Sequence, residues 1–153
     1  MNQSHFQVPG QPARSKLYSA SSIGVATFFG SWLAGAVLIS QNYRRLGDPD
    51  AARNALVVGI ASTVALILFT FSIVVPPTAE RALAHGLQAA QVAVIHLVLS
   101  KVQGAALKSH ASAGGEFFSR WRALGISLLL LPAALGIGLG LAFLFPTLPA
   151  IRE

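Results

Sequence analysis

Residues 17–40 read LYSASSIGVATFFGSWLAGAVLIS, and this stretch decides the fold class because it contains no charged residue. About 20 consecutive apolar residues in a helix are enough to cross the hydrocarbon core of a bilayer. Two further charge-free stretches, 55–75 and 123–145, are long enough to cross in the same way. The sequence therefore predicts an integral membrane protein.

A fourth stretch, 82–99, is uncharged when its histidines are neutral, but it is more polar than the others. With it, the chain has two pairs of apolar segments, the first joined by a tight turn at 44–50 and the second by the 100–122 loop. We therefore expect an all-α, integral membrane four-helix bundle made of two helical hairpins. The predicted parts are a flexible N-terminal tail (1–16), a transmembrane domain (17–145, with spans 17–40, 55–75, 82–99 and 123–145) and a short C-terminal tail (146–153).

The composition agrees with a membrane protein and excludes several other classes. Hydrophobic residues make up 54% of the 153 residues and charged residues only 10%, against roughly 25% charged residues in soluble domains. The net charge of +6 is explained by basic residues that flank membrane spans and face anionic lipids, so no nucleic acid is expected as a partner. There is no cysteine, which excludes disulfides, thiolate metal sites and thiol nucleophiles.

The turns between the spans carry recognisable end signals. Gly47 suits the left-handed conformation after a helix, Asp48 suits an N-cap and Pro49 suits the first helical position. Pro76 and Pro77 end the second helix. The third helix is expected from an N-cap at Thr78 to about Lys108, and the fourth from the 116–122 region to before Pro146, with a kink at Pro132.

The first span could also be a cleaved secretory signal. Arg14 and Lys16 precede it, and Ala34-Gly35-Ala36 resembles a cleavage site. However, the charge-free run is longer than an ordinary signal core and continues past Ala36. We therefore favour an uncleaved span.

The distribution of basic residues predicts an orientation. With four spans, both tails lie on one side and the loops 41–54 and 100–122 lie on the other. The loops carry more basic residues than the tails and the 76–81 turn do, so the positive-inside rule places the loops in the cytoplasm and both termini outside. The loop residues are Arg44, Arg45, Arg53, Lys101, Lys108, Arg120 and Arg122, and the others are Arg14, Lys16, Arg81 and Arg152.

Small residues in the first and fourth spans predict close helix packing. Gly30 with Ala34, Ser31 with Gly35, and Gly136 with Gly140 are each four residues apart, a spacing that lets helix backbones approach closely in lipid. These pairs serve either oligomerisation or internal packing, and we favour internal packing.

The third helix carries the strongest candidate site, a polar stripe. At 100° per residue, His85, His96 and Gln103 fall within about 20° of one another and Gln88 lies about 60° from His85. Polar groups inside a membrane tend to face the bundle interior. The stripe either lines a path for a small polar solute, or responds to protons through histidine, or is satisfied by neighbouring helices, which is the reading we favour.

Metal binding and catalysis have little support in the sequence. His85 and His96 are about 16 Å apart along a helix, too far to share an ion. Gly125-Ile126-Ser127 matches part of a GxSxG nucleophile motif, but Leu129 occupies the final glycine position. We expect neither a cofactor nor an enzyme.

One segment resembles a known group of proteins. Gly30-Ser31-Trp32-Leu33-Ala34-Gly35-Ala36, followed by Gln41-Asn42-Tyr43-Arg44-Arg45-Leu46-Gly47, is similar to the first hairpin of small uncharacterised bacterial four-helix membrane proteins. The resemblance implies a location in the bacterial inner (plasma) membrane and implies no activity.

Two functions fit these observations. The first is a non-catalytic accessory subunit or assembly factor of a membrane complex, partnered by other membrane subunits or by itself. The second is a small oligomeric channel or carrier for a polar solute, lined by the stripe residues. The basic loops could in addition hold anionic lipids.

Overall fold

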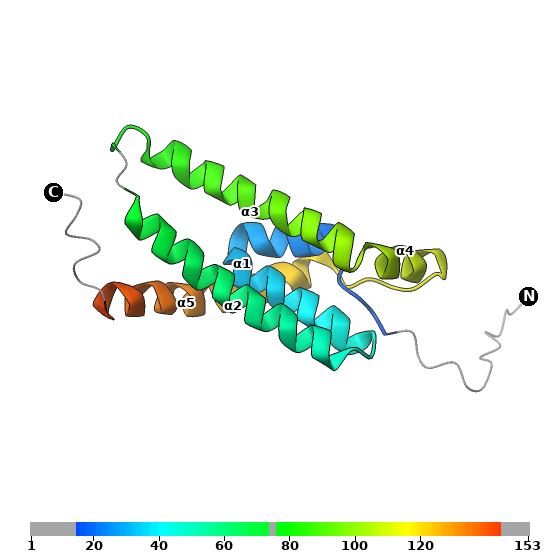
Figure 1. Ribbon diagram of the computed structural model, residues 1–153. Helices are drawn as coiled ribbons and strands as arrows, with labels where there is room; N and C mark the ends of the chain where they lie inside the picture. The colour runs from blue at the N-terminus through cyan, green and yellow to red at the C-terminus, as the bar shows by residue number, and fades with distance from the viewer. Residues whose placement is uncertain (1–14, 74–75, 145–153) are drawn as a thin grey trace, which may run out of the picture.

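The computed structural model describes residues 15–73 and 76–144, and this part of the chain is all-α (Figure 1). The predicted all-α fold class is confirmed, and four of the helices have the length and apolar composition of membrane spans. The tail segments 1–14 and 145–153 lie outside the described residues. The helices are α1 (Ala20–Arg45), α2 (Pro49–Ser72), α3 (Glu80–Val102), α4 (Gly104–Ser112) and α5 (Arg120–Leu144), and α4 is the one too short to span.

The first turn has the predicted end signals. Gly47 adopts a positive φ of 84° after α1. Asp48 is the N-cap of α2, where its carboxylate accepts a hydrogen bond of 2.9 Å from the Ala51 N–H, and Pro49 begins the helix. Prediction and structure agree here because each signal acts within a few residues.

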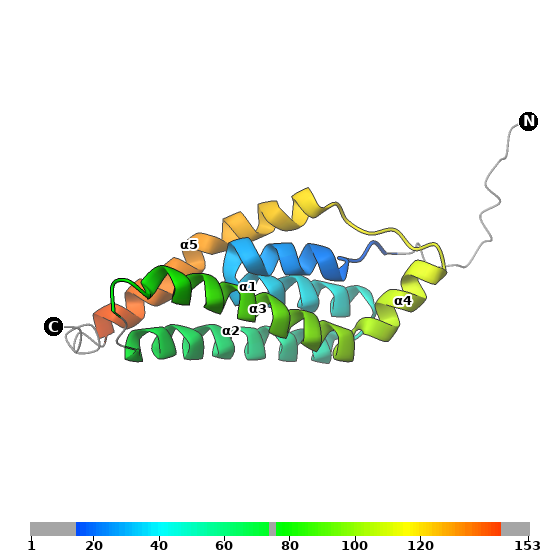
Figure 2. The ribbon, with the colours of Figure 1, turned by 90° about the horizontal axis from the view of Figure 1, so that it is seen from above.

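Helix α1 is not straight, and this is the main difference from the expected bundle. Ser31 has φ 75° and ψ 173°, a backbone region that is essentially restricted to glycine. At this residue the chain reverses, so that a first arm (residues 20–30) and a return arm (residues 32–45) run antiparallel and side by side (Figures 1 and 2). In Figure 1 the arms are the blue and cyan halves of α1.

Hydrogen bonds between the two ends of α1 establish the reversal. The Asn42 side chain accepts from the Tyr18 N–H at 2.7 Å and donates to the Tyr18 carbonyl at 2.8 Å. In a straight helix these two residues would lie about 36 Å apart. The Arg45 guanidinium also donates to the Lys16 carbonyl at 3.2 Å.

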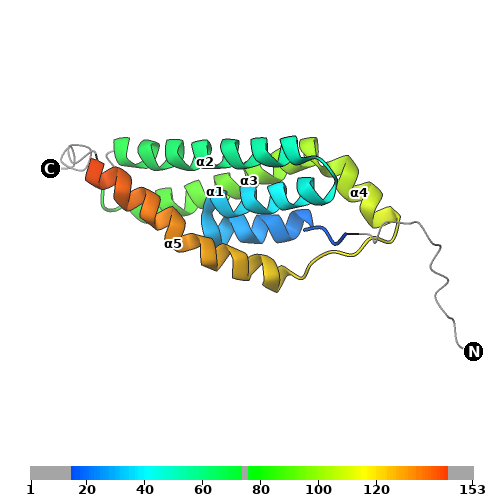
Figure 3. The same ribbon diagram turned by 90° about the horizontal axis from the view of Figure 1, so that it is seen from below.

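The reversal changes what α1 can do in a bilayer. The arms are about 16 Å and 21 Å long, whereas the hydrocarbon core is about 30 Å thick. Neither arm alone crosses it, while α2, α3 and α5 each do by length. Helix α1 is instead the central, mostly buried element against which α2, α3 and α5 pack (Figures 2 and 3).

The reversal also corrects the predicted placement of the N-terminal side. We expected the residues before the first span to lie opposite the loops. Residues 15–17 instead lie at the loop end, which we define as the end formed by the 46–48 turn and the 113–119 connection (Figure 1). There Leu17 forms an isolated bridge with Phe117, and Lys16 pairs with Glu116 at 2.6 Å. The physical reason is that α1 returns to the end at which it began.

Two expectations for the second half of the chain need correction. Helix α3 begins at Glu80 after Ala79, without a side-chain cap from Thr78. It ends at Val102 rather than near Lys108, because the Gln103 side chain is buried and donates to the Ile39 carbonyl at 3.0 Å. The chain then begins the separate helix α4. Helix α5 remains one helix through Pro132.

Cross-linking tests the reversal directly. In a Ser15→Cys/Arg45→Cys variant we expect fast intramolecular cross-linking by a short bifunctional thiol reagent, since the Ser15 hydroxyl donates to the Arg45 carbonyl at 3.2 Å. A straight helix would hold these positions about 45 Å apart. The absence of native cysteine keeps the background low. Ser15→Cys/Ser72→Cys is the control and should remain unlinked, and equal behaviour of both pairs would contradict the reversal.

Candidate functional site at the helix reversal

The end of the first arm carries backbone groups that its own helix cannot satisfy. The last four carbonyls of a helix lack intrahelical partners, and inside a membrane each unsatisfied group costs several kcal/mol. The Gln88 amide, reaching from α3, donates a hydrogen bond to the Phe28 carbonyl. Gln88 therefore acts as a C-terminal cap for a half-helix within the apolar part of the molecule.

Two other polar atoms near the reversal are buried and have no hydrogen-bond partner, namely the Ser31 Oγ and the Gln91 Oε1. The return arm and α3 both run toward the loop end, and a side chain on Gly35 would touch Ile95 at 3.4 Å. Ser31 precedes Gly35 by four residues and Gln91 precedes Ile95 by four residues, so Ser31 and Gln91 lie at a similar height along the two helices. A hydroxyl and an amide oxygen are thus left free where the chain reverses.

Such groups can hold a small polar molecule. Buried polar groups cost free energy unless they meet a hydrogen-bond partner, and ordered water commonly supplies one. The Ser31 hydroxyl can donate or accept, and the Gln91 oxygen accepts. Each of these two buried oxygens can therefore take a hydrogen bond from a small polar molecule.

Small side chains make the reversal compact. A Cβ on Gly30 would overlap Ser127 of α5, and one on Gly59 of α2 would overlap Ala36. Gly30, Ala34 and Gly35 are all buried inside the chain. Of the predicted packing residues, Gly136 and Gly140 differ, since side chains there would meet nothing within 4 Å.

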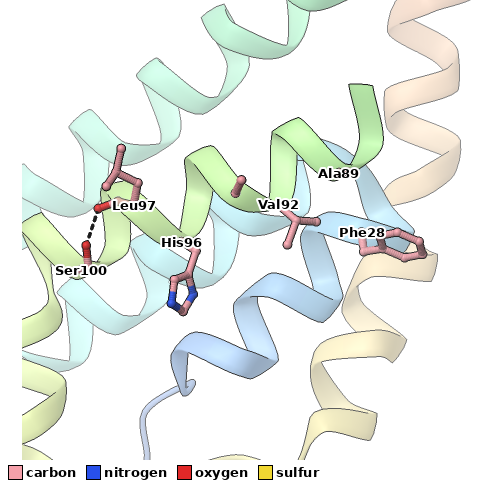
Figure 4. Close-up of a pocket in the computed structure, with 7 residues that line it drawn as sticks. Phe28, Ala89, Val92, His96, Leu97 and Ser100 are labelled. Carbon is pink, nitrogen blue, oxygen red and sulfur yellow. Dashed lines mark hydrogen bonds between the residues drawn. The ribbon is translucent and has the colours of Figure 1, made fainter. Parts of the chain in front are cut away.

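The predicted polar stripe of α3 is divided by the structure. Gln88 bonds the first arm, Gln103 is buried at the far end of α3 against α1, and His85 is exposed. His96 is also exposed, and its ring projects into a groove between α3 and the first arm (Figure 4). The groove has a volume of about 630 Å³, and the residues that share it with His96 are Phe28, Ala89, Val92, Ala93, Leu97 and Ser100.

The predicted basic residues gather at the loop end, and three of them have described partners. Arg53 lies 3.7 Å from Asp50. Arg45 and Arg122 lie with their guanidinium carbons 4.5 Å and 4.2 Å from the centre of the Phe118 ring. Arg44, Lys101, Lys108 and Arg120 are exposed.

The ion pair of Lys16 with Glu116 is the shortest at this end. The hydrogen bond and charge of the Lys16 ammonium hold the pKa of Glu116 below its usual range. This carboxylate is therefore ionised and engaged at neutral pH.

Sequence reasoning missed the residues that set the site. Asn42 is buried and bonds both Tyr18 and Gln103 (3.3 Å to Gln103 Oε1). The sequence shows an asparagine close after the apolar run of the first span, but it does not show which residue this asparagine would bond. The reversal at Ser31 left no sequence signal, because neither glycine nor proline occupies that position.

Comparison with protein-family models, with curated proteins and with solved structures finds no match to this chain. Within residues 15–73 and 76–144, no three histidine, aspartate or glutamate side chains gather into a group that could hold a metal ion.

The two glutamines of the site should respond oppositely to the same substitution. Gln88→Leu leaves the Phe28 carbonyl, which lies in the apolar part of the molecule, without its cap, so we expect a loss of about 1–3 kcal/mol in the free energy of unfolding. Gln91→Leu removes an oxygen that already lacks a partner, so it should be neutral or stabilising. Unfolding in mixed micelles, followed by circular dichroism, measures both. Equal destabilisation by the two changes would contradict the assigned roles.

Proposed function

We propose that this protein is a non-catalytic subunit of a membrane assembly, joined to further copies or to other membrane proteins. The observation that carries the proposal is a set of bare glycines on α5. Side chains at Gly136, Gly138 and Gly140 would meet nothing within 4 Å. Glycine on an open helix face lets another helix approach closely, and this packing drives association in lipid.

The contrast with the packed glycines strengthens this reading. A side chain would not fit at Gly30, Gly35 or Gly59, because other parts of the chain approach closely at these positions. The same residue type recurs on the part of α5 beyond the reversal, where no described segment covers it. Leu135 and Leu139 in this part are 60% and 73% exposed. If a helix of another chain packs closely on α5, these glycines have the same role there as the packed glycines have inside the protein.

The arrangement of the other helices points in the same direction. Helices α2, α3 and α5 all pack on α1. Among the described residues, α3 packs far less extensively on α2 and α5 than it does on α1. The exposed His96 lies within the apolar run of α3, and such groups in membranes usually face protein or a water-filled cavity. A neighbouring protein on this face would remove the imidazole from lipid.

We propose that the loop end faces the cytoplasm. With α1 reversed, α2, α3 and α5 cross the bilayer. Arg81 is then the one basic residue of the described chain at the opposite end, which is a stronger charge difference than the four-span arrangement gives. A membrane-impermeant thiol reagent should therefore label Ser72→Cys, but not Ser15→Cys, in intact cells, and the reverse pattern would invert the orientation.

Association through α5 can be tested by filling the bare face. We expect Gly136→Leu/Gly140→Leu to abolish co-purification of the partner or of a second tagged copy after gentle extraction. Gly125→Leu is the matched control, because it also adds a side chain at an open position of α5 but nearer the loop end. Helicity and thermal stability should stay close to wild type in both variants. A complex that persists in the double variant would exclude this face.

A second candidate is a small oligomeric channel or carrier for a polar solute. Half-helices that end inside a membrane occur where they are buried in protein or line a cavity, and transporters use them at binding sites. The reversal of α1, with the free Ser31 and Gln91 oxygens, favours this candidate. In reconstituted vesicles a solute flux that falls in Gln91→Leu and His96→Ala would support it, whereas flux unchanged by both would remove these residues from any path.

A further inference from the structure

A cluster at the loop end brings together three parts of the chain around one aromatic ring. Phe118 precedes α5, Arg45 ends α1 and Arg122 lies in the first turn of α5. The two guanidinium carbons lie 4.5 Å and 4.2 Å from the Phe118 ring centre, so they can be no farther apart than these two distances together. Both positive charges are thus held against the same ring.

Neither arginine has an acidic partner among the described residues. The nearby carboxylate of Glu116 is taken by Lys16 at 2.6 Å, and Asp50 pairs with Arg53. Arg45 uses one N–H for the Lys16 carbonyl, which leaves most of its donors free. Like charges on one ring repel each other when no counter-charge is present, so an anion that reaches both guanidinium groups would be stabilised.

The surroundings fit an anion at the membrane surface. Tyr18 is fully buried with its ring 4.7 Å from that of Phe118, so the Phe118 ring is supported from inside the bundle. Trp121, next to Arg122, is 80% exposed, as expected for a residue at the headgroup level. Arginine forks match the oxygen geometry of phosphate groups.

We propose that Arg45 and Arg122, held on the Phe118 ring, form a binding site for a phosphate-bearing anion, either a phospholipid headgroup or inorganic phosphate. Bound there, the anion would tie the end of α1 to the start of α5. Since this site lies at the loop end and the bare glycines of α5 lie beyond the reversal, the proposal does not depend on association through α5.

Lipid binding to the purified protein tests the proposal. Short-chain phosphatidylglycerol and phosphatidylcholine are titrated in detergent, and the bound lipid is measured by native mass spectrometry. Each basic residue near a bilayer surface contributes about fivefold, so Arg45→Gln/Arg122→Gln should weaken phosphatidylglycerol binding by about thirtyfold. The matched control, Arg53→Gln/Arg120→Gln, removes the same charge from positions at the loop end that do not contact the Phe118 ring, and it should change the binding by about twofold or less.

Further measurements separate the possible sources and guard against misfolding. Arg45→Lys/Arg122→Lys keeps the charge but loses the planar fork, and it should bind between the wild type and the glutamine variant. Displacement of the lipid by inorganic phosphate at similar concentration would identify free phosphate as the ligand. Phosphatidylglycerol that stays bound in the presence of inorganic phosphate would identify the lipid headgroup as the ligand. Equal losses in the Gln pair and in its control, or full binding in the Gln pair, would overturn the site.

Discussion

The hydrogen bonds between Asn42 and Tyr18 are the interaction on which the rest of the structure depends. They join the residues just before the first arm to the end of the return arm, and through Gln103 they also fix the end of α3. Because both backbone groups of Tyr18 are buried, losing the amide would leave them unsatisfied at considerable cost. This clamp offsets the strain of about 1–3 kcal/mol that a non-glycine residue in the Ser31 conformation carries.

The reversal then determines which surfaces are internal and which are free. The folded-back α1 places two short helices side by side. One apolar segment of the chain therefore provides the surface on which α2, α3 and α5 all pack. It reaches only about 21 Å along them, and the parts of α3 and α5 beyond it have no central helix to pack on. Gly30, packed on Ser127, and Gly136, which is bare, are the same residue type on the two sides of this boundary.

The sequence predicted what depends on short segments and missed what depends on distant ones. The Gly47-Asp48-Pro49 turn and the apolar lengths of the helices were predictable because hydropathy and capping act locally. The polar stripe was predicted as one face of a longer third helix, but Gln103 lies just after α3 has ended, where its side chain donates to the Ile39 carbonyl of α1. The free oxygens of Ser31 and Gln91 could not be predicted, since their pairing requires knowing that α1 reverses.

The same reversal explains why polar residues are tolerated in so apolar a chain. Two helix ends within the apolar region bring backbone groups that require partners, and Gln88 supplies one of them. A straight span would satisfy its own backbone and would need no glutamine beside it. Gln88 and Gln103 thus serve the folded-back α1, and the oxygens of Ser31 and Gln91, which have no partner in the protein, are what remains for a water or a solute to bind.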